Sequence, residues 1–599
     1  MSLFSELKRR NVFRIGAAYL VGAWLLVQVS ATLFPAFGFG ATAVRIVVIV
    51  LAIGFIPALA FAWVFEFTAA GLKRESAIDR GESTTPHTGK MLDRIIVVAL
   101  ALALGYFAFD KFVLSESREV SIAEEAHQAG RSEALVESYG EKSIAVLPFI
   151  DMSADKDQEY MSDGIAEELL NLLAKIPELR VISRSSAFSY KGKDIKLAEV
   201  ARELNVAHIL EGSVRKAGNQ VRITAQLIEA RSDTHLWSET YDRTLDDIFA
   251  IQDEIAARVV EQLKITLLGE VPKVAQTNPE AFALFLQARY LGLQFTPEGF
   301  EQSNALYEQA LAIDPNYAAA WAGMARNYIN QANDGLRRAD EGYPLAREML
   351  QKALALDPDY APAHARLGFI AMNYDNDLAT AARHMERALA LEPANLDIIG
   401  NAASLLVTLG RLDEAIALQQ YVTTQDPVSP IGHANLGYSH RLAGHWEQAI
   451  ASNRTFLQLS PGATGAHYEI GVALLFKGRP QAALEEMRQE TSEPFRLAGL
   501  SMTYHALGKR TESDAALEQL IAKYEVEWVY RIATVMAYRN EFDQVFDRLA
   551  KAAEINGDVH TDNLLANIHA DPRWLPFLRS IGKSPAQLDA IKFKVTLPE

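Results

Sequence analysis

A proline recurs at nearly constant spacing through the second half of the chain. These prolines are Pro315, Pro358, Pro393, Pro427, Pro461 and Pro494. Their successive spacings are 43, 35, 34, 34 and 33 residues. Each proline is predicted to end a helix, because it lacks an N–H group and clashes with the preceding turn. The chain is therefore predicted to repeat a helical unit of about 34 residues, with one insertion.

Between the prolines, the same residue types return at fixed offsets. A large ring stands at Trp321 and again at His433, and Leu436 and Gly437 follow the second ring. This pattern resembles the tetratricopeptide repeat (TPR) family. The resemblance implies an all-α superhelix, since each helix–turn–helix unit buries its apolar face only against its neighbours. About seven or eight units are predicted over residues 280–560, with a longer loop near 333–342.

The overall composition limits the possible functions. With 599 residues, the chain is long enough for several domains. A formal net charge of -17 argues against a nucleic-acid binder, whose surface would carry a basic patch. The absence of cysteine excludes disulfides, a thiolate nucleophile and a zinc site with cysteine ligands.

Three uncharged, apolar stretches lie near the N-terminus. They are Ile15–Phe34, Ile46–Phe65 and Ile95–Phe109, with the third extended to Leu114. Each is about as long as a helix that crosses a bilayer. We therefore expect three transmembrane helices in a membrane anchor at residues 1–114, followed by a spacer at residues 115–142. A small-residue site at Val29–Ala31 would instead suit a cleaved signal peptide.

Positive charges predict the orientation of this anchor. Lys and Arg residues precede the first stretch and separate the second from the third, and such residues mark the cytoplasmic side. The N-terminus is thus predicted to be cytoplasmic. Because three crossings are an odd number, the chain after Leu114 is predicted to lie in the periplasm, beyond a bacterial inner membrane.

From Ser143 onward, the sequence changes to short apolar runs. The predicted strands are Ser143–Phe149, Leu179–Ser183, His208–Val214, Val221–Leu227 and Thr234–Tyr241. The predicted helices are Gly164–Ala174, Leu197–Leu204 and Ile251–Leu267. Asp163 is predicted to be the N-cap of the first helix. Strands that alternate with helices predict an α/β domain at residues 143–270.

Several motifs in this domain are shared with a known module. They are Ala145–Phe149, Asp163–Gly164, Val181–Ser186, Tyr190–Gly192, Leu210–Val214, Arg222–Ile228, His235–Trp237 and Tyr241–Arg243. Residues 143–267 resemble the TolB amino-terminal-like module of proteobacterial TPR proteins. Leu7–Phe13 and Gly71–Glu75 resemble the membrane anchor often joined to it. The resemblance implies a cell-envelope module with a role in protein interaction, and it supplies no catalytic residues.

No catalytic, cofactor-binding or metal-ligating residues are predicted. Asp155, Asp157 and Glu159 alternate like the start of a calcium loop, but Tyr160 stands where that loop needs glycine. A solvated loop is therefore predicted there. The sequence contains no Walker, G-x-S-x-G or H-E-x-x-H motif. Three histidines at one shared repeat position are predicted to pack between helices; they are His364, His433 and His467.

The candidate interaction surface is the groove of the TPR superhelix. The TPR register predicts that its partner-binding residues are Arg326, Asn330, Phe369, Asn373, Tyr438, Arg441, Tyr468 and Phe476. Aromatic and arginine side chains often anchor interfaces. We expect a protein or peptide partner in this groove. The Lys and Asn clamp that binds C-terminal carboxylates in some TPR proteins is not evident.

The expected architecture is multi-domain. It combines N-terminal transmembrane helices, a TolB amino-terminal-like α/β domain, an all-α TPR superhelix at residues 280–560 and a C-terminal capping segment at residues 561–599. The predicted function is a non-enzymatic, inner-membrane-anchored interaction scaffold or sensor in the periplasm. The alternative is a regulatory component of a signalling pathway, because related modules are fused to nucleotide cyclases or to DNA-binding domains. The sequence does not predict the oligomeric state.

Overall fold

The computed structural model describes residues 142–597 except 194, 266–270 and 553–557. In the N-terminal part it describes residues 19, 22–23, 26–27, 30, 47–55, 57, 65–68 and 71–74. The chain divides into two compact units, residues 1–131 and 132–599. In the first unit, strand β1 (Phe65–Thr68) pairs antiparallel with strand β2 (Gly71–Arg74). The Tyr19 hydroxyl donates a hydrogen bond of 2.7 Å to the Leu51 carbonyl oxygen.

The predicted transmembrane helices are not supported. In the described part of the chain, no helix combines the length and the apolar character that a bilayer crossing requires. The second predicted span, Ile46–Phe65, ends on a residue that begins strand β1. The third, Ile95–Leu114, lies outside the described residues, as do many residues of the first two. Hydropathy reports composition alone, whereas a span also needs a continuous helix. The predicted location in the cell is not tested by the structure.

The second unit begins with a mixed six-stranded sheet. Its strands are β3 (Ser143–Val146), β4 (Ile150–Asp151), β5 (Arg180–Val181), β6 (His208–Ala217), β7 (Gln220–Glu229) and β8 (Thr234–Thr244). Their order is β5-β3-β6-β7-β8, with β4 beside β6. Strand β3 runs parallel to β5 and β6, whereas β6, β7 and β8 are antiparallel. Strands β6 and β7, predicted at His208–Val214 and Val221–Leu227, form a hairpin with Gly218 at a φ of 62° in its two-residue turn.

Helices cover both faces of this sheet. They are α6 (Glu159–Leu173), α7 (Arg184–Phe188), α8 (Leu197–Leu204) and α9 (Ile248–Gln262), which follows a 3-10 turn η3 (Leu245–Asp247). Successive strand side chains point to opposite faces. Ile144 and Val146 therefore join the apolar cluster that contains residues of α6 and α9, while Ala145 joins the cluster with α8.

Asp163 is not the N-cap that the sequence predicted. Helix α6 begins at Glu159, so Asp163 lies inside the helix and is buried. Its carboxylate pairs with the Lys191 ammonium at 2.5 Å. Lys191 also pairs with Glu159 at 2.6 Å. The cap prediction used local sequence only, whereas the position of Asp163 depends on a partner 28 residues away.

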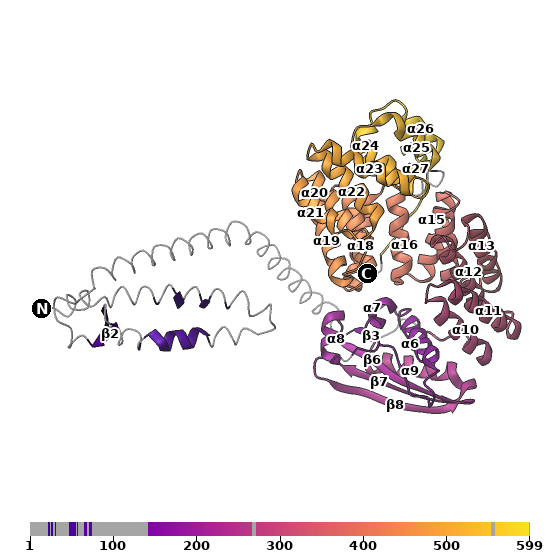
Figure 1. Ribbon diagram of the computed structural model, residues 1–599. Helices are drawn as coiled ribbons and strands as arrows, with labels where there is room; N and C mark the ends of the chain where they lie inside the picture. The colour runs from indigo at the N-terminus through magenta and orange to yellow at the C-terminus, as the bar shows by residue number, and fades with distance from the viewer. Residues whose placement is uncertain are drawn as a thin grey trace. The chain divides into compact units, whose positions relative to one another are not determined.

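Residues 279–551 form an array of eight helix pairs (Figure 1). The first four pairs are α10 (Pro279–Gly292), α11 (Pro297–Ile313), α12 (Ala318–Asn333), α13 (Ala339–Leu356), α14 (Ala361–Asn373), α15 (Leu378–Leu391), α16 (Leu396–Thr408) and α17 (Leu412–Gln425). The next four are α18 (Pro430–Leu442), α19 (Trp446–Leu459), α20 (Ala466–Phe476), α21 (Pro480–Gln489), α22 (Glu493–Ala506), α23 (Arg510–Tyr524), α24 (Val529–Tyr538) and α25 (Val545–Lys551), with η4 (Phe542–Gln544) before α25.

The insertion does not form the long loop that the sequence predicted. It lengthens the helices, because α12 and α13 have 16 and 18 residues whereas α14 and α15 have 13 and 14. Gly342, predicted in the loop, lies within α13. Pro494 also differs from its prediction, since it stands in the first turn of α22 and ends no helix. Proline is tolerated there because the first turn has no use for its missing N–H group.

In three repeats, the ring at the shared repeat position lies within hydrogen-bond distance of the proline carbonyl oxygen in the preceding loop. The Trp321 Nε1 lies 3.5 Å from the Pro315 carbonyl oxygen. His364 Nε2 lies 3.0 Å from the Pro358 oxygen, and His433 Nε2 lies 2.8 Å from the Pro427 oxygen. His467 instead pairs with Glu486 at 2.7 Å. Each of these four rings is half-buried, and its nitrogen contacts a carbonyl or carboxylate oxygen nearby in the sequence.

The α/β domain contacts the array at two places. At the first, Arg289 of α10 donates to Glu168 of α6 at 2.6 Å and to the Gly164 carbonyl oxygen at 3.2 Å. At the second, the Arg180 Nε donates to the Gln425 carbonyl oxygen at 2.8 Å. The first four helix pairs thus begin and end against the α/β domain, which lies beside α10 in Figure 1.

The residues after the array fold back over it. They form η5 (Asn563–Ile568), α26 (Trp574–Ser580) and α27 (Pro585–Asp589). Trp574 and Leu578 are buried in one apolar cluster with Phe546 of α25. Residues 590–597 then run without helix or strand.

Candidate interaction surface of the helix array

The predicted partner-binding residues all belong to the first helices of their pairs. Arg326 and Asn330 lie in α12, and Phe369 and Asn373 lie in α14. Tyr438 and Arg441 lie in α18, while Tyr468 and Phe476 lie in α20. We define the first-helix face as the surface that α12, α14, α16, α18 and α20 form together.

Part of the first-helix face binds another segment of the same chain. We call residues 558–563 the acidic segment, because Asp558 and Asp562 lie in it. The Tyr438 hydroxyl donates to Asp558 Oδ2 at 2.6 Å. Arg441 Nη1 donates to Asp562 Oδ1 at 3.2 Å. Two of the eight predicted residues therefore contact a polypeptide segment about 120 residues further along the chain.

Electrostatic interactions hold this contact together. Arg441 is fully buried, and its Nε also donates to Glu469 Oε2 at 2.5 Å. Burial alone would lower the pKa of Arg441, but Glu469 and Asp562 raise it well above the ordinary value. Burial raises the pKa of Asp562, yet Arg441 and Arg531 outweigh burial and hold that pKa below its usual value. The Arg441 guanidinium and the Asp562 carboxylate are therefore both charged near neutral pH.

Tyr468 and Phe476 pack inside the array. Tyr468 is fully buried, and the Arg531 guanidinium lies 5.2 Å from the centre of its ring. The Phe476 ring stacks on Trp446 at 4.7 Å with an angle of 4° between the planes. In this structure neither ring projects freely into solvent, and both stabilise neighbouring helices.

The remaining predicted residues lie nearer the α/β domain. Within the described residues, Nε and Nη2 of Arg326 are buried and have no hydrogen-bond partner. The Asn373 side chain donates to the Phe369 carbonyl oxygen at 3.1 Å within its own helix. Asn330, Phe369 and Asn373 are half-buried. Whether these side chains bind a partner stays a prediction.

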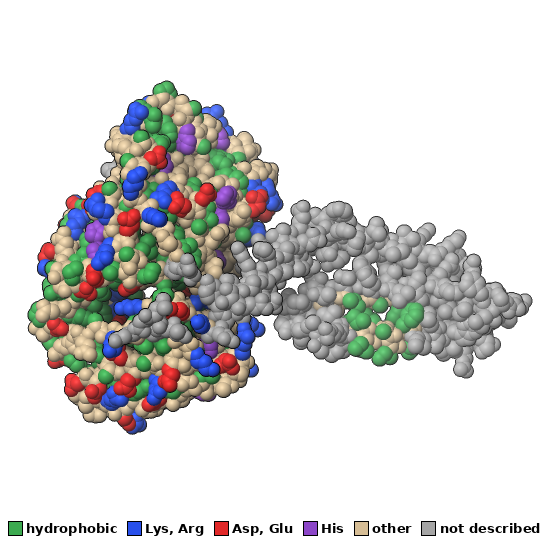
Figure 2. Space-filling model, turned by 180° about the vertical axis from the view of Figure 1, so that it is seen from behind, with side chains coloured by type: hydrophobic (Ala, Val, Ile, Leu, Met, Phe, Trp, Pro, Cys, Tyr) green, Lys and Arg blue, Asp and Glu red, His purple; other side chains and the backbone are tan. Residues whose placement is uncertain are grey.

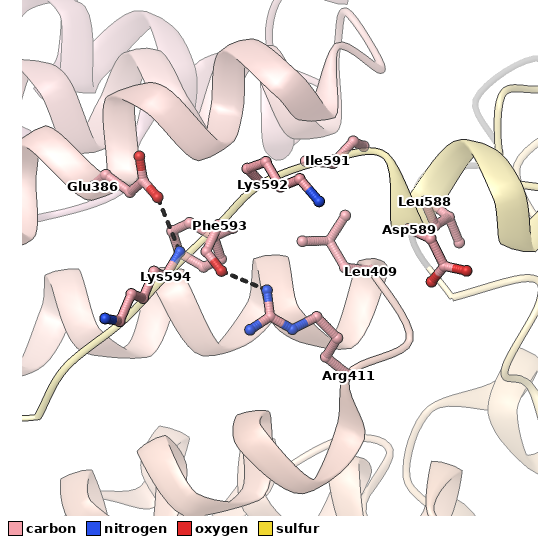
Figure 3. Close-up of a pocket in the computed structure, with 9 residues that line it drawn as sticks. All are labelled: Glu386, Leu409, Arg411, Leu588, Asp589, Ile591, Lys592, Phe593 and Lys594. Carbon is pink, nitrogen blue, oxygen red and sulfur yellow. Dashed lines mark hydrogen bonds between the residues drawn. The ribbon is translucent and has the colours of Figure 1, made fainter.

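A second segment lies on the array beyond the acidic segment. We call residues 588–597 the terminal segment. The Lys594 backbone N–H donates to Glu386 Oε1 at 2.9 Å, and Arg411 Nη1 donates to the Phe593 carbonyl oxygen at 2.5 Å (Figure 3). Leu588 and Phe593 are buried in one apolar cluster with residues of α15, α16 and α17.

The binding of these two segments to the array was not predicted from the sequence. The acidic segment carries no local pattern that reveals its partners, since Tyr438 and Arg441 are distant in sequence. The terminal segment did carry a signal, because Ile591, Phe593 and Val595 alternate with polar residues. Such alternation predicts an extended chain with one buried face.

The described residues offer no metal centre, because no group of three or more His, Asp or Glu side chains among them could hold an ion. Asp151 ends strand β4, just before the predicted solvated loop of Asp155 and Asp157, and it accepts hydrogen bonds from the Ser153 and Gln158 backbone N–H groups at 2.8 and 2.9 Å. Burial alone would raise the pKa of Asp151, but these hydrogen bonds outweigh burial and hold that pKa below its usual value. The carboxylate thus orders its own loop.

On the face seen in Figure 2, acidic and basic side chains are interspersed.

Comparisons with known families identify the helical part. Residues 373–434 and 435–493 each match a family model described as tetratricopeptide repeat. The chain carries TPR repeats. Residues 140–258 match a model described as the HilA/YgeH-like transcriptional regulator, second domain. This match covers much of the α/β domain, and the resemblance of that domain to the TolB module stays a prediction.

Individual relatives are similar to parts of the chain. "Putative adenylate cyclase 3" of Rhizobium meliloti (strain 1021) is 43% identical over 199 residues, 32% of this chain and 34% of that protein. The chain thus spans about a third of the length of this relative. The structure titled "Human IFIT1 dimer with PPP-AAAA" has a TM-score of 0.35 at 14% identity, covering 54% of this chain and 79% of that one. Pseudomonas aeruginosa PilF has a TM-score of 0.30 at 19% identity, covering 38% and 96%.

Proposed function

We propose that this protein is a non-enzymatic interaction scaffold or sensor whose TPR array binds a protein or peptide partner. TPR repeats support this role, because stacked helix pairs present an extended surface to other polypeptides. One observation carries the proposal: Tyr438 and Arg441 on the first-helix face already hold a polypeptide segment of this chain. The same face continues through α14 and α12, where the predicted residues Asn373 and Asn330 are half-buried.

A site-specific photo-crosslinker tests the proposal. We would place it at Asn373 on the first-helix face and, as a control, at Arg510, whose side chain is 93% exposed. We expect a specific partner to crosslink at Asn373 and not at Arg510. Crosslinking only from a third position, the exposed Asp242 on β8, would make the sheet the interaction surface and contradict the proposal.

A second candidate function is regulation of a signalling pathway with a nucleotide cyclase or transcriptional output. It is supported by the relative named as a putative adenylate cyclase and by the match to a domain of HilA/YgeH-like regulators. In this role, binding of a partner to the α/β domain or the array would regulate a separate output protein. Deleting the gene should then change cellular cyclic AMP or a defined transcript, and the purified chain should form no cyclic AMP from ATP.

A further inference from the structure

The terminal segment crosses the array as an extended chain with one buried face. Phe593 is 4% exposed, and Ile591 and Val595 on either side of it are half-buried. The intervening Lys592 and Lys594 are exposed. This period of two is what an extended peptide shows when it lies on an apolar surface.

The surface beneath the terminal segment is built by α15, α16 and α17. It supplies apolar side chains that pack in one cluster with Phe593, Val595 and Leu597; they are Leu389, Leu396, Leu412, Tyr421 and Val422. Glu386 and Arg411 bind backbone groups of the segment and not its side chains. A site that holds the backbone by polar groups and alternate side chains by apolar contact accepts extended peptides as a class.

The terminal segment is not packed tightly along its whole length. A cleft of about 340 Å³ lies between it and the array, lined by Glu386, Leu409 and Arg411 of the array and by residues of the segment itself (Figure 3). Beyond α27, Phe593 is the one buried side chain among the described residues of the segment. Segments with few buried apolar contacts open at a low free-energy cost. The acidic segment differs, because the buried Arg441 ties it to the array by an ion pair.

We propose that this surface on α15–α17 is a docking site for an extended segment of a partner protein, and that residues 590–597 occupy it until the partner displaces them. The partner segment would carry apolar residues at alternate positions, with an aromatic ring in the place of Phe593. This inference rests on the scaffold function proposed above and specifies its partner. A tethered segment acts at an effective concentration of up to about millimolar, so it competes strongly with a free ligand.

A peptide with the sequence of residues 591–597 tests the docking site. Its binding would be measured by fluorescence anisotropy with the full chain, with a shortened chain that ends at Ala590 and so lacks these residues, and with full-length Phe593→Ala. We expect the shortened chain to bind the peptide at least about tenfold more tightly than the full chain, because the tethered competitor is gone. Phe593→Ala should give an intermediate affinity. The same peptide with Phe593→Ala should bind at least about tenfold more weakly, since a central aromatic anchor is lost.

Matched changes in the array locate the site. In the shortened chain, Arg411→Ala should weaken peptide binding, because it removes the donor to the Phe593 carbonyl oxygen. Arg387→Ala should leave binding unchanged, because this exposed α15 residue pairs with Asp359, away from the segment. Circular dichroism and melting would confirm that each variant is folded. If the shortened chain does not fold, the test uses full-length Phe593→Ala. This variant must then bind the peptide more tightly than the unaltered chain does.

Three results would overturn the inference. The first is a folded shortened chain that does not bind the peptide, and the second is equal binding by all three proteins. The third is a dimer of the full chain that disappears on shortening, since a second copy would then occupy the site. The peptide comes from this chain, so the test is independent of the photo-crosslinking at Asn373. Failure of the crosslinking with success of the peptide would reject the scaffold role and leave the internal contact intact.

Discussion

His560 in the acidic segment links the stability of the fold to pH. Both of its ring nitrogens are buried without hydrogen-bond partners in the described residues. Burial, with smaller effects of Lys583 and His569, lowers the pKa of His560 to about 4. The unfolded chain therefore binds a proton below its ordinary pKa of about 6.5 that the folded chain does not bind. Stability should fall as the pH drops from 6.5 toward 4, by up to about 3 kcal/mol from this residue.

The variant His560→Leu should lose less stability over that pH range, because leucine cannot take up the proton. Urea unfolding at pH 7 and pH 4.5 would measure the difference. The dependence should not vanish, since burial also lowers the pKa of His440 to about 4. Parallel pH profiles for the variant and the unaltered chain would show that His560 does not cause this dependence.

At the scale of helices, two glycines offer a matched comparison. Gly323 in α12 faces Tyr307, and a Cβ atom at Gly323 would lie 2.4 Å from the Tyr307 ring. A Cβ at Gly400 in α16 would meet nothing within 4 Å. We expect Gly400→Ala to stabilise the array by up to about 1 kcal/mol through helix propensity. Gly323→Ala should destabilise it by about 1–3 kcal/mol through overpacking against a buried ring.

Urea unfolding of the full chain, followed by far-UV circular dichroism, would measure both glycine changes. Equal shifts in the same direction would mean that α11 and α12 can separate without cost, in conflict with the close approach at Gly323. The two changes share the same chemistry and the same helical setting. Their difference therefore isolates the contact between neighbouring helices.

The elements that sequence predicted well are those whose causes are local. Helix α8 has its predicted bounds, Leu197–Leu204, because an apolar period and an αL residue at Asn205 define it. The two strands of the β6–β7 hairpin were predicted because their apolar runs flank the turn-rich gap Lys216–Asn219. Helix α6 begins at Glu159 and not at the predicted Gly164. Asp163 was taken for an N-cap because its true partner, Lys191, is 28 residues away and leaves no local signal. The predicted membrane spans are not supported, because no helix among the described residues is long and apolar enough to cross a bilayer.

The candidate site could be predicted only in part. The TPR register located Tyr438 and Arg441, because it follows from the repeat spacing. Their partners Asp558 and Asp562 could not be predicted, since no short-range pattern connects residues about 120 positions apart. The contact between the array and the α/β domain is of the same kind, because Arg289 meets Glu168 across 121 residues.

For the whole molecule, Arg289 makes one of the two contacts that join the array to the α/β domain. Its side chain is 8% exposed, and it lies 2.6 Å from Glu168 and 3.5 Å from Glu167. Burial alone would raise the pKa of Glu167, but Arg289 and Arg184 hold it below its usual value. Arg289→Met would therefore remove the 2.6 Å partner of Glu168 and leave the buried Glu167 carboxylate with Arg184 alone. Breaking a buried pair in this way costs about 3–5 kcal/mol.

Arg258→Met on α9 is the matched control for Arg289→Met. Arg258 also faces two carboxylates, Glu239 at 3.8 Å and Glu261 at 2.8 Å, but its side chain is 48% exposed. Exposed pairs contribute about 0–1 kcal/mol, so this change should hardly move the melting curve. Calorimetry of Arg289→Met should show the α/β domain and the array melting in separate transitions. A single transition at the unaltered temperature would mean that the contact of Arg180 with Gln425 suffices to hold the two domains together.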